Sequence, residues 1–99
     1  MPISISCNIA EGAKIAFQNG QYQVTGSATP TAPSTEVTAL EYSINNGLPA
    51  AISPPYDPYR FSLSAADCPQ VNENYTLTIT GTDQESRHYS ISRTFTRTA

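Results

Sequence analysis

The stretch YTLTITGTD, from Tyr75 to Asp83, alternates between large apolar residues and threonine. Successive side chains of a β-strand point to opposite faces. Tyr75, Leu77 and Ile79 would therefore share one face, and the threonines would share the other. Threonine is β-branched and suits an extended backbone. The stretch predicts a strand with one face in a core and the other in water.

The same period of two recurs along most of the chain, and no segment shows a competing helical period. A short return arm, 48–52, is predicted as a weak edge strand. The other segments with an apolar face are 3–9, 15–17, 22–28, 40–44, 59–65 and 89–95. Short strands at this spacing predict an all-β fold, a two-sheet antiparallel β-sandwich of seven to eight strands.

An Asn-Gly pair, Asn19-Gly20, separates two of these segments. This pair favours a two-residue type I′ turn, because both central residues need positive φ. Such a turn would place Phe17 opposite Tyr22. The same register would place Ile15 opposite Val24, so that all four apolar side chains fall on one face.

Proline and a second Asn-Gly pair mark the other breaks in the pattern. Pro30 and Pro33 cannot donate ladder hydrogen bonds, so 29–36 is predicted as a loop. Asn46-Gly47 is predicted to turn the chain after the segment 40–44. The proline-rich PPYDPY, 54–59, is predicted as an extended, polyproline-like crossing between the two sheets.

One residue breaks the last alternation. Arg93 has the same parity as the apolar Ile91 and Phe95. Two explanations are open: a β-bulge re-aims the side chain, or Arg93 lies at the rim of the sandwich beside a carboxylate.

Length and charge limit the function classes. The 99 residues are sufficient for one domain, 1–99. The net charge is −3 and no basic run is present, which argues against nucleic acid as a partner. No apolar stretch approaches the length of a membrane span, so no membrane insertion is expected. The first residues lack a signal-peptide pattern. Composition favours a module of a larger extracellular or cell-surface protein, with a cytoplasmic protein as the alternative.

The chain resembles bacterial immunoglobulin-like domains, which share degenerate motifs with fibronectin type III modules. The resemblance covers roughly residues 10–96 and is carried by QYQVTGSA at 21–28, LEYSINNG at 40–47, YRFSL at 59–63 and YTLTITGTD at 75–83. It implies an immunoglobulin-like two-sheet sandwich. In that fold Tyr42 would occupy the core position where immunoglobulin domains usually place Trp. Tyr75 would form the tyrosine corner, in which the hydroxyl bonds an upstream backbone group.

The two cysteines, Cys7 and Cys68, leave several interpretations open, because one disulfide, two buried thiols or a reactive pair all fit the count. Val24 and Leu77 would stand where antibody domains place their cysteines, so the antibody-type disulfide is absent. The immunoglobulin-like topology would place the end of the first strand and the loop containing Cys68 at the same pole. A Cys7–Cys68 bridge there is one alternative, and two independent thiols are the other.

Candidate ligand-binding residues lie in the proline-rich segment. Tyr56 and Tyr59 could stack on a sugar ring or a peptide, with Asp57 between them, or they could belong to the core and its edge. His88 with Asp83 and Glu85 suggests a metal site only weakly, since alternation sends neighbours to opposite faces. Solvated turn residues are the favoured interpretation, and no cofactor or metal is predicted.

No nucleophile–base set can be assembled from the sequence, so we do not expect an enzyme. The favoured function is that of a non-catalytic module, acting as a spacer, adhesion or interaction domain beside neighbouring domains. A carbohydrate- or ligand-binding accessory module is the first alternative, and a structural domain of a virus or phage particle is the second. The Ser and Thr face of the last two strands could contact another domain, a glycan or an ordered water layer, or could simply be solvated.

Overall fold

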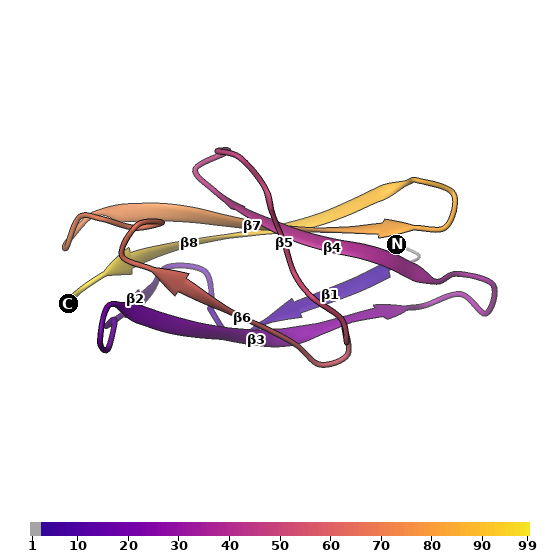
Figure 1. Cartoon of the computed structure of the whole chain (residues 1–99), viewed down its shortest axis with the longest axis horizontal. Coiled ribbons are helices and arrows are strands. Elements are labelled where there is room, and N and C mark those ends of the chain that lie inside the picture. The colour runs from indigo at the N-terminus through magenta and orange to yellow at the C-terminus, as the bar shows by residue number, and fades with distance from the viewer. Residues whose placement is uncertain (1–2) are drawn as a thin grey trace.

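The computed structural model describes residues 3–99, which form eight β-strands (Figure 1). Strict alternation of apolar and polar residues specifies most of them, since one face of each strand is buried. The strands are β1 (Ile3–Cys7), β2 (Ala13–Ile15), β3 (Gln21–Pro30), β4 (Val37–Ile44), β5 (Ala50–Ala51), β6 (Tyr59–Ser64), β7 (Asn74–Asp83) and β8 (His88–Arg97).

The strands form two sheets, of order β1-β3-β6 and β2-β8-β7-β4-β5. Every pairing is antiparallel except the short β2–β8 pair, which is parallel. The all-β, immunoglobulin-like two-sheet sandwich predicted from the sequence is therefore confirmed. Figure 1 shows the two layers one above the other, each running along the long axis, with β3 and β6 below β4, β7 and β8.

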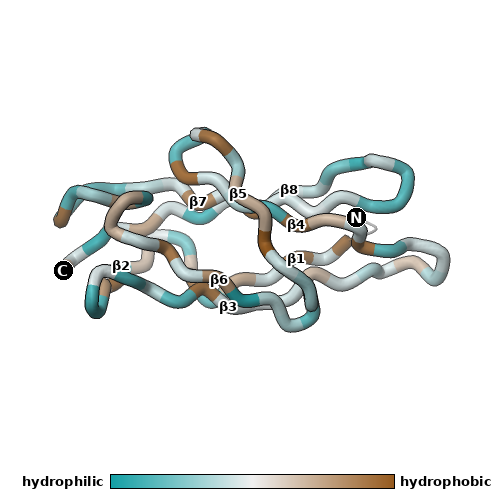
Figure 2. The backbone as a smooth tube through the Cα atoms, viewed as in Figure 1, coloured by the Kyte–Doolittle hydropathy of each residue, from teal (hydrophilic) through white to brown (hydrophobic). Residues whose placement is uncertain are grey.

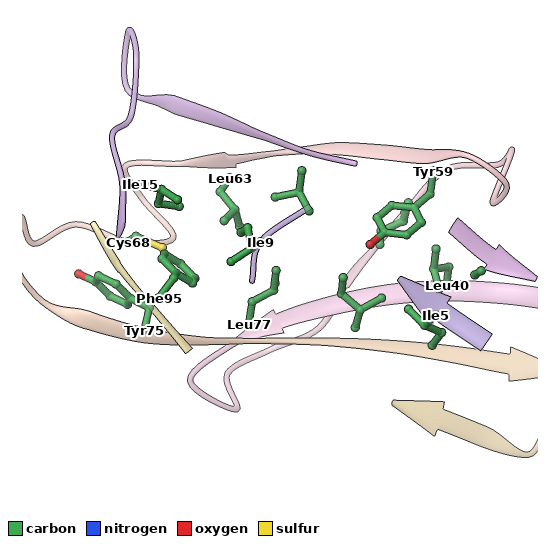
Figure 3. Packing of buried hydrophobic residues seen from close by; sticks show 14 of the residues in the cluster. Ile5, Ile9, Ile15, Leu40, Tyr59, Leu63, Cys68, Tyr75, Leu77 and Phe95 are labelled. Carbon is green, nitrogen blue, oxygen red and sulfur yellow. The ribbon is translucent and has the colours of Figure 1, made fainter. Parts of the chain in front are cut away.

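The core lies between the sheets and is built from the inward parity of each strand. β7 alternates without a break between buried and half-buried residues from Tyr75 to Asp83. Leu77 and Ile79 are 1% exposed and belong to one hydrophobic cluster with Leu63 of the facing sheet, and Figure 3 shows Leu77 and Leu63 within it. No buried side-chain polar atom within residues 3–99 lacks a hydrogen bond.

The turn at Asn19-Gly20 forms, but the strand before it, β2, pairs with β8 and not with β3. Both residues have positive φ, 55° and 76°, and Gln18 and Gln21 exchange two backbone hydrogen bonds. The predicted pairing of Ile15 with Val24 is wrong. Ile15 pairs with Arg97 of β8 in the other sheet, because the Phe17 N–H donates to the carbonyl of Ala99 and draws the chain away from β3.

The second predicted turn is displaced by one residue. Positive φ occurs at Asn45 and Asn46 instead of at Asn46-Gly47, and the Gly47 N–H donates to the Ile44 carbonyl. The Asn45 side chain also accepts a bond from the Thr76 N–H, which fixes this turn to β7. β5 is a two-residue edge strand, and the segment 52–58 crosses from it to β6 in the other sheet, as predicted.

Arg93 follows neither of the two explanations offered by the sequence. β7 and β8 pair without a bulge, with Leu77 opposite Arg93. Within residues 3–99 the ion pairs involve Arg87, and Arg93 donates instead to the carbonyl of Ser92. The part of β8 beyond β2 is an open sheet edge, so a half-buried Arg93 can reach a backbone acceptor and water there.

The connecting loops differ in hydropathy. Figure 2 shows hydrophilic residues on the β7–β8 loop, and hydrophobic residues on the loop between β4 and β5. Leu48 in that second loop is 95% exposed, but a single exposed apolar residue is ordinary for a protein surface. Residues 3–99 contain no helix long and apolar enough to cross a membrane.

Candidate functional site

Tyr75 forms the corner that the resemblance implied. Its ring is buried at the start of β7 and packs against Phe95, with ring centroids 5.9 Å apart. The hydroxyl accepts from the Gln70 N–H at 2.7 Å and donates to the Gln70 carbonyl at 3.2 Å. One side chain thus satisfies both backbone groups of a loop residue, so its role is structural.

Replacing Tyr75 with phenylalanine should lower the free energy of unfolding by about 1–2 kcal/mol, because both bonds to Gln70 are lost while the ring stays. Chemical denaturation measures the change. Tyr56→Phe is the matched control, since the Tyr56 hydroxyl makes no hydrogen bond within residues 3–99. Equal stability of the two variants would mean that the corner contributes nothing.

The two cysteines are free thiols in the structure, and no Cys7–Cys68 disulfide is present. β1 ends halfway along β3, where Cys7 pairs with Gly26. Cys68 lies beyond the far end of β6, past the Gln21–Ser64 pair. From Gly26 to Gln21, β3 advances by five residues, which corresponds to about 16 Å along the strand. The Cα atoms of two bridged cysteines lie within about 7 Å of each other, so Cys7 and Cys68 are too far apart for a disulfide. Figure 3 shows Cys68 and Tyr59, the partner of Gly26 in β6, toward opposite ends of the labelled core residues.

The environments of the two thiols differ. Cys68 is buried, and burial raises the pKa of its thiol to about 11, with Asp67 adding to the shift and Arg97 opposing it. Cys7 is half-buried, and its sulfur accepts a hydrogen bond from the Ile9 N–H. Cys68 is therefore an inert core thiol at neutral pH, because the reactive species is the thiolate.

A thiol titration of unreduced protein should find two free thiols in denaturant and at most one fast-reacting thiol in the folded state. Cys7→Ser should remove the fast phase, and Cys68→Ser should leave it unchanged. An unfolded, unreduced chain without reactive thiols would show instead that a bridge had formed.

Asp83 is the polar residue that the sequence interpretation placed wrongly. It was expected to be a solvated turn residue, yet it is 1% exposed. Its carboxylate accepts from the backbone N–H groups of Glu85 and Arg87, each at 2.9 Å, and from the Arg87 Nε at 2.9 Å. The Tyr89 hydroxyl donates a fourth bond at 3.3 Å. Its parity with Tyr75, Leu77 and Ile79 was the signal that could have placed it inward.

These bonds also set the charge state of Asp83. Burial by itself would raise the pKa of this carboxyl group. The N–H groups of Arg87 and Glu85, and then the Arg87 guanidinium, outweigh burial and hold the pKa below its ordinary value. Asp83 therefore carries a negative charge that closes the β7–β8 turn, and it is not free to bind a ligand.

The other candidate metal ligands are also in use. The Thr82 hydroxyl and His88 Nδ1 lie 3.0 Å apart, and Glu85 pairs with Arg87 at 2.9 Å. Within residues 3–99 no group of three or more His, Cys, Asp or Glu side chains converges on a point. Alternation along β7 and β8 separates them, with Asp83 inward and His88 on the outer face.

The outer face of β7 and β8 is a ladder of hydroxyl pairs. Thr78 lies 3.1 Å from Ser92, and Thr80 lies 2.9 Å from Ser90, each pair directly opposite across the strands. Cross-strand hydroxyl pairs of this kind stabilise a sheet. The two pairs therefore tie β7 to β8 on the outer face of the sheet.

The proline-rich crossing contains the three residues proposed as ligand-binding. Tyr59 is fully buried, and its hydroxyl donates to the Ser6 carbonyl at 2.6 Å. Tyr56 is half-buried against the core, and its carbonyl accepts from the Ala28 N–H. Asp57 is exposed. The structure therefore does not bring these three side chains together on one surface, since Tyr59 points inward as its parity indicates.

A pocket of about 360 Å³ lies beside the same crossing. Three prolines line it, Pro54, Pro55 and Pro58, and its polar lining residues include Ser53, Arg60 and Thr25 of β3. Tyr59 contributes to the lining, while Tyr56 and Asp57 do not. The crossing thus forms a pocket, but of the three residues expected to bind a ligand only Tyr59 lines it.

No protein-family model and no curated protein matches the chain. Two solved structures share its fold. Part of the endo-β-1,4-mannanase of Thermotoga petrophila superposes with a TM-score of 0.67 and 14% identity, over 95% of this chain but only 20% of the mannanase. The fibronectin(III)-like modules of Clostridium thermocellum CbhA superpose with a TM-score of 0.62 and 13% identity, over 97% of this chain and 96% of the module. Identities this low show a common fold alone.

Proposed function

We propose that this domain, which has the fold of fibronectin type III-like and immunoglobulin-like modules, is a non-catalytic spacer and interaction module in a larger exported chain. The observation that carries the proposal is where its ends lie. The domain measures 43 × 21 × 20 Å. Ile3 pairs with Pro30 at one pole, and Arg97 pairs with Ile15 near the other, so the ends of β1 and β8 are separated along the long axis (Figure 1).

This geometry suits a module inserted between neighbours, because it adds its own length between them. The polar groups on the surface of residues 3–99 are consistent with a spacer role. Asp83 is engaged in the β7–β8 turn, and two pairs of outer hydroxyls bond each other. The similar mannanase contains this fold as 20% of its chain, and the similar CbhA domains are described as modules. These likenesses support a modular role without assigning a partner.

The test is to replace the domain within its parent protein. An unrelated fibronectin type III module of the same length should preserve the parent's activity or surface display, whereas deletion of the domain should impair it. If the replacement fails as badly as the deletion, the domain's own surface is required and a spacer role is insufficient.

A further inference from the structure

We propose that the pocket beside the β5–β6 crossing, lined by Arg60 and three proline rings, binds a carboxylated sugar residue. This goes beyond the spacer role, because it assigns a ligand to a specific site. The pocket's volume of about 360 Å³ lies at the lower end of the range for small-ligand sites. It therefore suits a single ring-sized group.

The charge of the pocket points to an anionic group. Three of the four arginines are occupied within the domain: Arg87 by Asp83, Arg97 by the carbonyl of Cys68, and Arg93 by the carbonyl of Ser92. The Arg60 side chain makes no hydrogen bond or ion pair within residues 3–99, although its backbone pairs with Thr25 in the β3–β6 ladder, and Arg60 lines the pocket. A free guanidinium presents two parallel N–H donors that match a carboxylate.

The remaining groups of the pocket suit a sugar ring. Thr25 and Ser53 line the pocket, and their hydroxyls form no hydrogen bond to any other residue of 3–99, so both can exchange bonds with sugar hydroxyls. Pro54, Pro55 and Pro58 present apolar C–H surface that can contact the less polar face of the ring. Proline rings fix the local backbone, so little order must be gained on binding.

The acidic residue within the crossing does not oppose this assignment. Asp57 lies between the prolines in sequence, but it is exposed and does not line the pocket. Tyr59 is not a stacking platform, because its ring is buried and its hydroxyl bonds Ser6. Recognition would therefore depend on Arg60 and the two hydroxyls instead of on an aromatic ring.

The test is a titration of the isotopically labelled domain with trigalacturonic acid, followed by amide chemical shifts. Shifts should be confined to Thr25 and 53–60, and salt should weaken binding. Arg60→Gln should raise the dissociation constant about tenfold, because a charge-assisted bidentate contact is lost. Asp57→Asn is the matched control in the same segment, and it should bind at least as tightly as the unmodified domain.

Three further ligands separate the alternatives. Neutral galactotriose should bind much more weakly, and equal binding would overturn the role of Arg60. Acetate that competes as well as the sugar acid would reduce the site to a general anion site and overturn the sugar assignment. A short acidic peptide that binds more tightly than the sugar acid would overturn it in favour of a protein partner. Absence of any shift at millimolar trigalacturonic acid, with the domain folded, would refute the proposal.

Discussion

Gly26→Ala is expected to destabilise the domain by about 3–5 kcal/mol, or to prevent folding altogether. Gly26 lies in β3, where it pairs with Cys7 of β1 on one side and with Tyr59 of β6 on the other. A Cβ atom added there would overlap the carbonyl oxygen of Ser6. It would also lie 2.8 Å from the Ser6 carbonyl carbon and 2.6 Å from the Tyr59 hydroxyl oxygen.

Backbone atoms cannot move aside as a flexible side chain can, so the clash must separate β1 from β3 or distort both. The absence of a side chain at Gly26 is what lets the buried Tyr59 reach across β3 to donate its hydroxyl to Ser6. An aromatic side chain beside a strand glycine is a known way to recover packing lost at that glycine. The substitution therefore disturbs three strands together.

Gly81→Ala is the matched control, because Gly81 also lies on the inward face of a central strand. A Cβ atom there would meet the side chains of Ile3 and Ile5 at 3.5 Å, an ordinary contact distance. We expect a change within about 1 kcal/mol, which could be stabilising because alanine restricts the unfolded chain. Denaturant unfolding of both variants measures the difference, and equal stabilities would contradict the close approach of β1 to β3.

Tyr59→Phe separates the two sources of the clash at Gly26. In the double variant Gly26→Ala, Tyr59→Phe the hydroxyl contact is gone, but the Ser6 carbonyl still blocks the new Cβ atom. The two substitutions should therefore couple, with only part of the stability recovered. Complete recovery would place the whole clash on the hydroxyl.

The strands were predictable because their signal is local. A period of two in Tyr75–Asp83 is visible in a short window, and burial of one face follows from it. The turn at Asn19-Gly20 was predictable for the same reason. The partner of β2 was not, because a turn sequence specifies the bend and not how far the pairing continues. The backbone bond from Phe17 to Ala99, more than 80 residues away, decides that Ile15 joins β8.

The candidate sites divide in the same way. The alternation of β6 indicated that Tyr59 points inward. The alternation of β7 indicates the same for Asp83, but the charge of its side chain favoured a solvent-exposed position in the sequence analysis. The pocket was beyond the sequence, because Thr25 and Arg60 become neighbours only when β3 and β6 pair. The free state of Arg60 depends on where every acidic side chain lies, which no local pattern contains.

Asp83→Asn is expected to lower the melting temperature at pH 7 by about 10 °C. The carboxylate accepts four hydrogen bonds in a buried position, two at each oxygen. Asparagine keeps one acceptor oxygen, but its NH2 group would face the donors of either the backbone or Arg87. The turn would then open, and with it the bonds of Gln84 to the loop before β4.

Two control variants distinguish the effect of the buried Asp83 carboxylate from the effect of removing a surface charge. Asp57→Asn removes an exposed carboxylate that has no partner within residues 3–99, so it should change the melting temperature very little. Glu85→Gln breaks the ion pair between Glu85 and Arg87. The side chains of Arg87 and Glu85 are 55% and 62% exposed, and ion pairs this exposed contribute little to the free energy of unfolding. If Glu85→Gln were as damaging as Asp83→Asn, the guanidinium pair and not the buried carboxylate would hold the turn.

Acidification supplies the decisive comparison for Asp83. The pKa of this carboxyl group is lower in the folded state than its ordinary value of 3.8. Its contribution to stability is therefore complete above that value and is lost as the pH falls through the folded-state pKa. The gap in melting temperature between the unmodified domain and Asp83→Asn should be constant from pH 7 to about pH 5 and should shrink below about pH 4. A gap that stayed constant down to pH 2 would show that the shape of the side chain, and not its charge, closes the turn.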